Sequence, residues 1–185
     1  MPRPLPSPAA ILLRYLLPET VETNRLLLRR WRPEDAVRLD EIYDQAEYLE
    51  HMPPASGFEQ VPAWQELWEE DGFSKWAACD RATGRLIGRI GLMRHHDWPL
   101  ASDPLEVGWI LDRDYWGLGL ATEGGQAAVD AWRAYLPDEM LYSFTVPENG
   151  RSRAVMERLG MGLGGTAVWR GREHVWYSLA RHEAS

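Results

Sequence analysis

The 185-residue sequence contains a single cysteine, Cys79, and this scarcity limits the chemistry open to it. One cysteine cannot form a disulfide within the chain, which fits a reducing compartment, and we expect a cytoplasmic protein. Cys79 lies in a strand-like run, residues 75–79, and this setting favours core packing over a role as a nucleophile.

Long apolar runs and an excess of positive charge are also absent. No stretch approaches the roughly 20 apolar residues that span a membrane. Residues 1–20 are rich in proline and carry a short apolar run interrupted by Arg14, which we interpret as a flexible arm rather than a signal peptide. The formal net charge of −8 argues against a broad nucleic-acid-binding surface.

Ligand spacing for a metal ion is missing as well. His95, His96 and Asp97 are adjacent, so they point in opposite directions on an extended chain, and no cysteine or further histidine lies at ligand spacing. We therefore expect no metal. The sequence has no internal repeat and no linker, so residues 21–182 are expected to form one domain.

What the sequence does contain is a glycine-bearing turn between a strand-like and a helix-like run. Residues 105–111 have the pattern of a strand, residues 126–135 that of an amphipathic helix, and Gly117 and Gly119 lie between them. A turn at a helix N-terminus offers uncovered N–H groups and the positive end of the helix dipole. Because glycine lets the backbone approach a ligand closely, the turn predicts an anion or pyrophosphate site.

Two common phosphate loops fit this turn poorly. A nucleotide-hydrolase loop needs Gly-Lys-Ser/Thr, whereas Gly119 is followed by Leu-Ala-Thr. A dinucleotide-binding loop needs a third glycine three residues after the second, where this chain has Thr122.

Three motifs, in order along the chain, carry a resemblance to a known family. Residues 116–123, WGLGLATE, resemble the acyl-CoA pyrophosphate loop of the GNAT superfamily of N-acyltransferases, Gln/Arg-x-x-Gly-x-Gly/Ala, with Trp116 in place of Gln/Arg. Residues 146–161, VPENGRSRAVMERLGM, are similar to the Asn-x-x-Ser-x-x-Val-x-x-Lys-x-Gly-Phe motif of its ribosomal-protein N-terminal acetyltransferase branch. Residues 22–29, ETNRLLLR, resemble the start of that branch.

The element pattern and the resemblance agree on an α/β fold with a mixed, mostly antiparallel central sheet and helices on both faces. The predicted strands are residues 25–30, 74–80, 85–93, 105–111, 140–146, 162–169 and 172–179. The predicted helices are residues 33–48, 63–71, 126–135 and 152–159, and residues 52–62 are expected to be a loop. The resemblance implies that the strands on either side of the turn and its helix splay apart to receive the pantetheine arm of CoA.

Two residues are the candidates for catalysis. Glu106 lies in an otherwise apolar strand beside the expected splay, where partial burial would raise its pKa and suit it to act as the base. An exposed position on a half-buried strand is the alternative. The resemblance gives Ser152 the role of the acid toward the CoA thiolate, and the alternative is a helix-capping serine.

The resemblance assigns cofactor binding to the turn and its flanks. The loop amides and the Thr122 hydroxyl would hold pyrophosphate, the side chains of Arg113, Arg151 and Arg153 would meet phosphates, and Asn149 would hold the pantetheine or order the strand end. The predicted cofactor-binding residues are Ile110, Leu111, Arg113, Trp116, Gly117, Leu118, Gly119, Leu120, Ala121, Thr122, Asn149, Arg151 and Ser152. Glu123 is expected to have a structural role.

Together these features predict an acetyl-CoA-dependent N-acetyltransferase that acts by direct transfer in a ternary complex. The acceptor would be a primary amine, either of a protein N-terminus or of a small molecule, and a homodimer through terminal strands is compatible with the pattern. A non-catalytic CoA-binding sensor on the same fold is the alternative. Trp31 and Trp98 are candidates to line an acceptor pocket, and an acidic group could attract a cationic acceptor. That group is Glu66, Glu69, Glu70 and Asp71.

Overall fold

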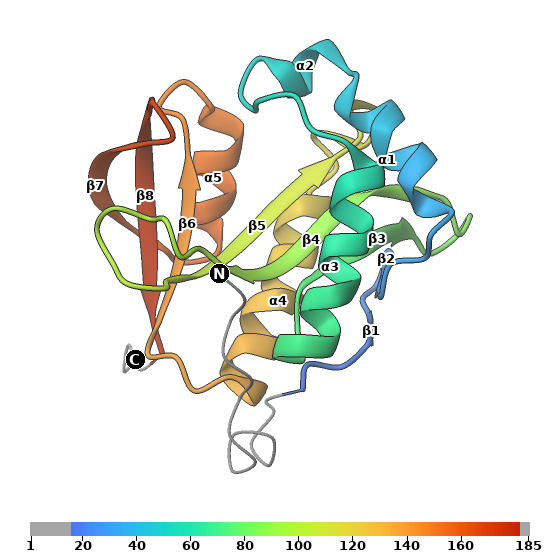
Figure 1. Cartoon of the computed structure of the whole chain (residues 1–185), viewed down its shortest axis with the longest axis horizontal. Helices are drawn as coiled ribbons and strands as arrows, with labels where there is room; N and C mark the ends of the chain where they lie inside the picture. Colours follow the sequence, from blue (N-terminus) through green and yellow to red (C-terminus); the bar gives the residue numbers. More distant parts are fainter. Residues whose placement is uncertain (1–15, 182–185) are drawn as a thin grey trace, which may run out of the picture.

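The structure, a computed structural model, describes residues 16–181 and contains one eight-stranded sheet in the order β1-β2-β3-β4-β5-β6-β8-β7 (Figure 1). The strands are β1 Thr20–Glu22, β2 Leu26–Arg29, β3 Lys75–Asp80, β4 Leu86–Arg94, β5 Leu105–Leu111, β6 Met140–Thr145, β7 Gly162–Trp169 and β8 Arg172–Ala180. The helices are α1 Asp35–Tyr43, α2 Ala46–Leu49, α3 Gly57–Asp71, α4 Leu120–Tyr135, α5 Gly150–Arg158 and the 3-10 turn η2 Arg113–Tyr115.

Neighbouring strands run antiparallel throughout the sheet, except for β5 and β6, which are parallel. Helices cover both faces, so the predicted fold class is confirmed. Both expected hairpins, β3–β4 and β7–β8, are present. The second one turns through Arg170 and Gly171, which both have positive φ angles, as a tight two-residue hairpin turn requires.

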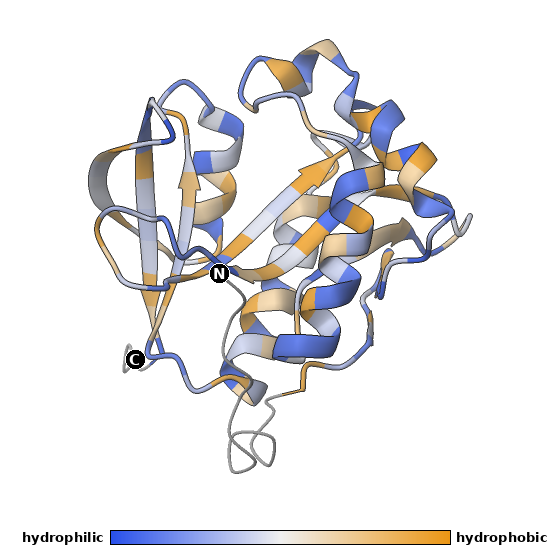
Figure 2. Cartoon of the chain, in the orientation of Figure 1, coloured by the Kyte–Doolittle hydropathy of each residue, from blue (hydrophilic) through white to orange (hydrophobic). Residues whose placement is uncertain are grey.

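Alternation along the strands divides the core between two faces of the sheet. On β3, Trp76 and Ala78 belong to the cluster that packs against α4 and α5, whereas Ala77 and Cys79 belong to the cluster under α1 and α3. Successive side chains of a strand point to opposite faces, so one strand serves both clusters. Hydrophilic and hydrophobic residues are interspersed along α1 and α3, as covering helices require (Figure 2).

The largest differences from the predicted bounds concern three helices, whereas the strands agree within one residue at each end. The helix predicted over residues 33–48 is two helices, because Gln45 is extended and its side chain bonds Asp112 Oδ1 (3.0 Å) and the Arg113 N–H (3.1 Å). Helix α3 begins at Gly57, inside the predicted loop, because the Ser56 hydroxyl accepts from the Phe58 N–H. The helix predicted from residue 126 begins six residues earlier, at Leu120.

The N-terminal end of the chain was predicted to be an arm over residues 1–20. Residues 1–15 lie outside the described part. Leu17 is buried in the core, and Thr20 begins β1, which pairs with β2. Within residues 16–181, no helix is both long and apolar enough to cross a membrane.

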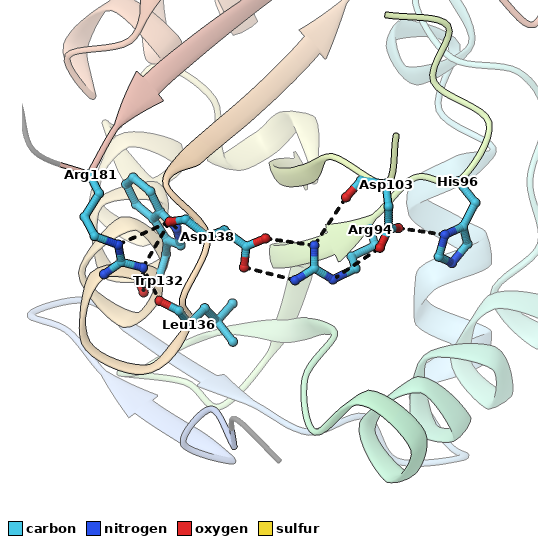
Figure 3. A network of polar contacts seen from close by, with 7 residues as sticks. All are labelled: Arg94, His96, Asp103, Trp132, Leu136, Asp138 and Arg181. Carbon is cyan, nitrogen blue, oxygen red and sulfur yellow. Dashed lines mark hydrogen bonds and ion pairs between the residues drawn. The ribbon is translucent and has the colours of Figure 1, made fainter. Parts of the chain in front are cut away.

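A polar network fastens one end of the sheet, where β5 begins and where the chain leads into β6 (Figure 3). Arg94 donates two hydrogen bonds to the Asp138 carboxylate, at 2.9 and 3.0 Å, and one to the Asp103 carbonyl. Arg181 donates to the carbonyls of Asp138 and Leu136. The loop before β5 and the segment before β6 are thereby tied together.

Candidate active site

The turn between β5 and α4 presents a row of free backbone donors. Gly117 and Gly119 have φ angles of 75° and 77°, which favour glycine because other residues are strained there. Within the described chain, the N–H groups of residues 117–122 donate no hydrogen bond to protein. They lie at the N-terminus of a 16-residue helix, whose dipole adds to their attraction for an anion.

Glu123 anchors this turn from its underside. Its carboxylate accepts from the Thr23 hydroxyl (2.6 Å), the Arg25 N–H (2.8 Å) and the Arg25 side chain (2.7 Å). Arg25 also donates to the Leu118 carbonyl (2.7 Å). The Glu123 carboxylate is therefore held by Thr23 and Arg25, the residues just before β2.

The strands β5 and β6 diverge beside the turn. They share one register pair, Glu106 with Tyr142, and beyond it β5 remains bonded to β4 while β6 remains bonded to β8. In Figure 1 the two strands open like a V toward α5 and α2. The polar network of Arg94 lies at the closed end of the V.

A cavity of about 870 Å³ occupies the open end. Its walls are the last residues of β5, the turn, the start of α4, the start of α5, and the region around α2. The predicted cofactor-binding residues line it, except for Arg113 and Leu118. The structure therefore gathers residues from three separated parts of the sequence around one space.

The three arginines expected to meet phosphate differ in their surroundings. The Arg151 guanidinium lies 4.7 Å from the centroid of the Trp116 ring, and both residues line the cavity. Arg113 pairs with Glu47 at 2.8 Å, and Arg153 donates to the Tyr177 hydroxyl and the Pro147 carbonyl. Of the three, only Arg151 lines the cavity.

The start of α5 brings Asn149 and Ser152 to the cavity wall. The capping function considered for Ser152 belongs to Asn149, whose side-chain oxygen accepts from the Ser152 N–H at 3.1 Å. The Ser152 side chain lines the cavity at the first turn of the helix. Its hydroxyl donates no hydrogen bond within residues 16–181, so it is available to a ligand.

Glu106 lies at the closed end of the V and is held by two cationic or protonatable side chains. Its Oε2 atom is 2.9 Å from Lys75 Nζ and 2.8 Å from His95 Nε2. Lys75, Gly91 and Gly108 are register neighbours on β3, β4 and β5. A Cβ atom added to Gly108 would lie only 2.9 Å from Lys75 Nζ. The lysine side chain therefore reaches Glu106 through space that a side chain at position 108 would fill.

The expectation that burial raises the pKa of Glu106 is wrong. Burial does favour the neutral acid, but the charge of Lys75, the adjoining His95 ring and the hydrogen bonds of both outweigh it, and the pKa lies well below its usual 4.5. Burial, helped by the charge of Arg89, lowers the pKa of Lys75 to about 8. Glu106 is therefore a fixed carboxylate at neutral pH.

The sequence interpretation missed Lys75, His95 and Arg89 as members of this site. The available signal was a charged residue in each of two apolar strands, with Lys75 in β3 and Arg89 in β4, and both are buried. His95 had been weighed only as a metal ligand. Within residues 16–181, no group of three or more His, Cys, Asp or Glu side chains could hold a metal ion.

The two tryptophans expected near an acceptor pocket are buried, and neither lines the cavity. The Trp31 indole donates to the Lys75 carbonyl (2.8 Å). Trp98 packs on Phe144 with ring centroids 4.0 Å apart and meets Trp169 edge-on. They support the surroundings of Lys75 and His95.

Comparison with known proteins adds an independent result. Residues 25–162 match the family model described as acetyltransferase (GNAT) domain. The uncharacterized N-acetyltransferase p20 of Bacillus licheniformis is 26% identical over 147 residues, which are 76% of this chain and 81% of that protein.

Two solved structures show the same fold. The ribosomal-protein-S5-alanine acetyltransferase from Vibrio fischeri matches with a TM-score of 0.72 and 18% identity, covering 90% of this chain and 98% of that one. RimL, a ribosomal L7/L12 alpha-N-protein acetyltransferase in complex with coenzyme A, matches with a TM-score of 0.71 and 14% identity, covering 88% and 98%.

Proposed function

The chain belongs to the GNAT family of acetyltransferases and uses acetyl-CoA, and on that premise we propose that it acetylates a primary amine by direct transfer in a ternary complex. The observation that carries the proposal is the row of free N–H groups at residues 117–122, which opens into the cavity beside the diverging strands. Its motifs and fold resemble the ribosomal-protein acetyltransferase branch.

We place the pyrophosphate of acetyl-CoA on these free amides, where the dipole of α4 adds to their attraction. Arg151 is positioned to meet a phosphate, because it lines the same cavity and lies over Trp116. The pantetheine arm would run along Trp109, Ile110 and Leu111, whose backbone on the β6 side is unpaired within the described sheet. This arrangement would leave the thioester near the point of the V.

In the proposed reaction the amine nitrogen attacks the thioester carbonyl carbon, and the C–S bond breaks to release the CoA thiolate. An amine is mostly protonated at neutral pH, so it must lose two protons in total. One leaves through water toward Glu106, whose depressed pKa passes it on to solvent, and the other reaches the thiolate sulfur by way of the Ser152 hydroxyl. As a fixed carboxylate, Glu106 would also orient the water that receives the proton.

Direct transfer is supported by the position of the only cysteine in the chain. Cys79 is 1% exposed and faces the core under α1 and α3, outside the cavity. An acetyl-enzyme on this thiol would require the acetyl group to pass through packed side chains. The acceptor remains a protein N-terminus or a small amine under this proposal, and the cytoplasm is the proposed location.

The first test is thermal unfolding with acetyl-CoA, and with NAD and ATP as controls. A ligand that binds only the native state raises the melting temperature by mass action. We expect a rise with acetyl-CoA alone, followed by amine-dependent release of thiol in a panel of amines. A rise with NAD or ATP and none with acetyl-CoA would refute the proposed cofactor site.

A further inference from the structure

Arg89 is a buried cation that lacks a carboxylate partner in the described part of the chain. It is 7% exposed, and none of the ion pairs within residues 16–181 includes it. Its Nε atom donates to the Tyr43 hydroxyl (3.1 Å), and its guanidinium lies 5.4 Å from the centroid of the Trp64 ring. An uncompensated buried charge is unfavourable unless it has a partner, so the site favours an anion.

The surroundings of Arg89 add positive charge rather than remove it. The register of β3, β4 and β5 puts Lys75, Arg89 and Glu106 on one face, around the glycine pair Gly91 and Gly108. Lys75 already neutralises Glu106 through its 2.9 Å contact. Arg89 is thus the cation on this face of the sheet that no carboxylate balances. Its charge helps to lower the pKa of Lys75.

Arg89 lies directly behind the cavity wall. Its register partner on β5 is Ile110, which lines the cavity. Tyr43, which accepts its hydrogen bond, stacks on Tyr48 with ring centroids 4.6 Å apart, and Tyr48 also lines the cavity. A ligand group that enters between Ile110 and Tyr48 therefore approaches the guanidinium.

We propose that the acceptor amine also carries a carboxylate, and that Arg89 is the residue that selects for it. This inference rests on the proposed function and narrows its substrate class to amino acids, or to peptides whose carboxylate can reach the same position. It differs from the expectation of a cationic acceptor, because Glu66, Glu69 and Glu70 are exposed on the outer side of α3, away from Arg89.

The test compares acceptors in matched pairs, each amino acid against the amine that lacks its carboxylate, such as phenylalanine with phenylethylamine and β-alanine with ethylamine. A tripeptide with an acidic side chain and its uncharged amide analogue distinguish a peptide source from a free amino acid. Thiol release gives kcat and KM for the wild type and for Arg89→Met, Arg89→Lys and Arg85→Met. Arg85 is an exposed arginine just before β4 and serves as the control.

We expect the wild type to favour the carboxylate-bearing member of a pair at least tenfold in kcat/KM. Arg89→Met should abolish this preference by raising the KM of the carboxylate-bearing amine far more than that of the carboxylate-free amine, while Arg89→Lys should retain part of it. Arg85→Met should behave as wild type. Equal use of both members by the wild type, or an equal loss for both in Arg89→Met, would overturn the inference and leave the acetyltransferase assignment intact.

A binding measurement keeps the inference testable without turnover. In the presence of CoA, N-acetylphenylalanine should raise the melting temperature of the wild type more than N-acetylphenylethylamine does, and Arg89→Met should remove the difference. No difference in the wild type would count against Arg89 as an anion site. Absence of acetylation for every amine would instead contradict the proposed function.

Discussion

At the scale of single residues, Glu106 owes its charge to the two side chains that share its Oε2 atom. Lys75 reaches it across Gly108, and His95 reaches it from the loop after β4. Burial alone would have favoured the neutral acid. The site therefore contains a carboxylate that is ionised before any substrate arrives.

Replacing Glu106 by Gln should reduce kcat by about 100-fold, within the usual range for loss of an acid–base group, because the amide cannot accept the proton. The Kd of acetyl-CoA should not change, since Glu106 lies outside the cavity that holds the cofactor-binding residues. Turnover assays and isothermal titration measure the two effects, with the exposed Glu173→Gln as control. Unchanged kcat would remove Glu106 from the chemistry.

Lys75→Met should raise the pKa of Glu106, so that its titration affects activity at a higher pH than in the wild type. In the wild type the pKa of Glu106 is depressed and that of Lys75 is lowered to about 8, so the ion pair is present between pH 4.5, the unfolded value of the glutamate, and about pH 8, and it is lost as the pH falls from 4.5 toward the folded pKa of Glu106. Without the charge of Lys75, burial is opposed only by His95, and the pKa rises. The acid limb of the kcat/KM profile should move upward in the variant, and coincident limbs would show that Lys75 does not control Glu106.

At the scale of elements, the turn and α4 act as one unit. The left-handed conformations of Gly117 and Gly119 leave the N–H groups of residues 117–122 without protein acceptors, and the dipole of α4 adds to their attraction for an anion. Gly124 on the first turns of α4 lies against Ile90, where a Cβ would collide, so the helix sits close to β4. Glu123 fixes the same turn to the start of β2.

Gly119→Ala should weaken acetyl-CoA binding at least tenfold, because a side chain strains the φ of 77° and the loop relaxes away from its donor geometry. The matched control is Gly84→Ala, whose φ is 73° and whose added Cβ would meet no atom within 4 Å, while at Gly119 it would make only an ordinary contact with Arg25 at 3.6 Å. Both variants should lose about 1 kcal/mol of unfolding free energy from backbone strain. Equal acetyl-CoA affinity in the two would contradict a role for the loop in binding.

Much of this element order could be predicted from local pattern. The bounds of β5 and β7 agree with the predicted ones, because each strand is followed directly by a charged residue, Asp112 or Arg170. Helix α3 begins inside a predicted loop, since Pro62 suggested an interruption while the capping Ser56 lies one residue before the helix. Cross-strand partners such as Lys75 and Glu106 are 31 residues apart, and only the sheet register joins them.

At the scale of the whole molecule, the strands β5 and β6 are paired at one end, at Glu106 and Tyr142, and diverge toward the other. The network of Arg94, Asp138 and Arg181 holds the closed end, and the cavity occupies the open end. β7 is an outer strand of the sheet, and homodimerisation through terminal strands stays a prediction that light scattering can test.

Arg94→Met should lower the free energy of unfolding by about 1–2 kcal/mol, because a two-bonded, partly buried arginine–aspartate pair is lost. For a chain of this size each kcal/mol corresponds to roughly 2–4 °C in melting temperature. Arg170→Met breaks a similar but exposed pair with Asp97, and it should cost less than about 0.5 kcal/mol. Equal losses of unfolding free energy in the two variants would argue against a role for the network in stabilising the paired end of β5 and β6.

The measurement that tests the central claim most directly is mass spectrometry of the products formed from acetyl-CoA labelled in its acetyl group. With a suitable amine, we predict that labelled acetyl appears on the amine nitrogen in an amount equal to the CoA thiol released. Thiol released without an acetylated amine would identify a thioesterase. Acetyl-CoA binding with neither product would identify a CoA-binding protein without transfer activity, and either result would contradict the account.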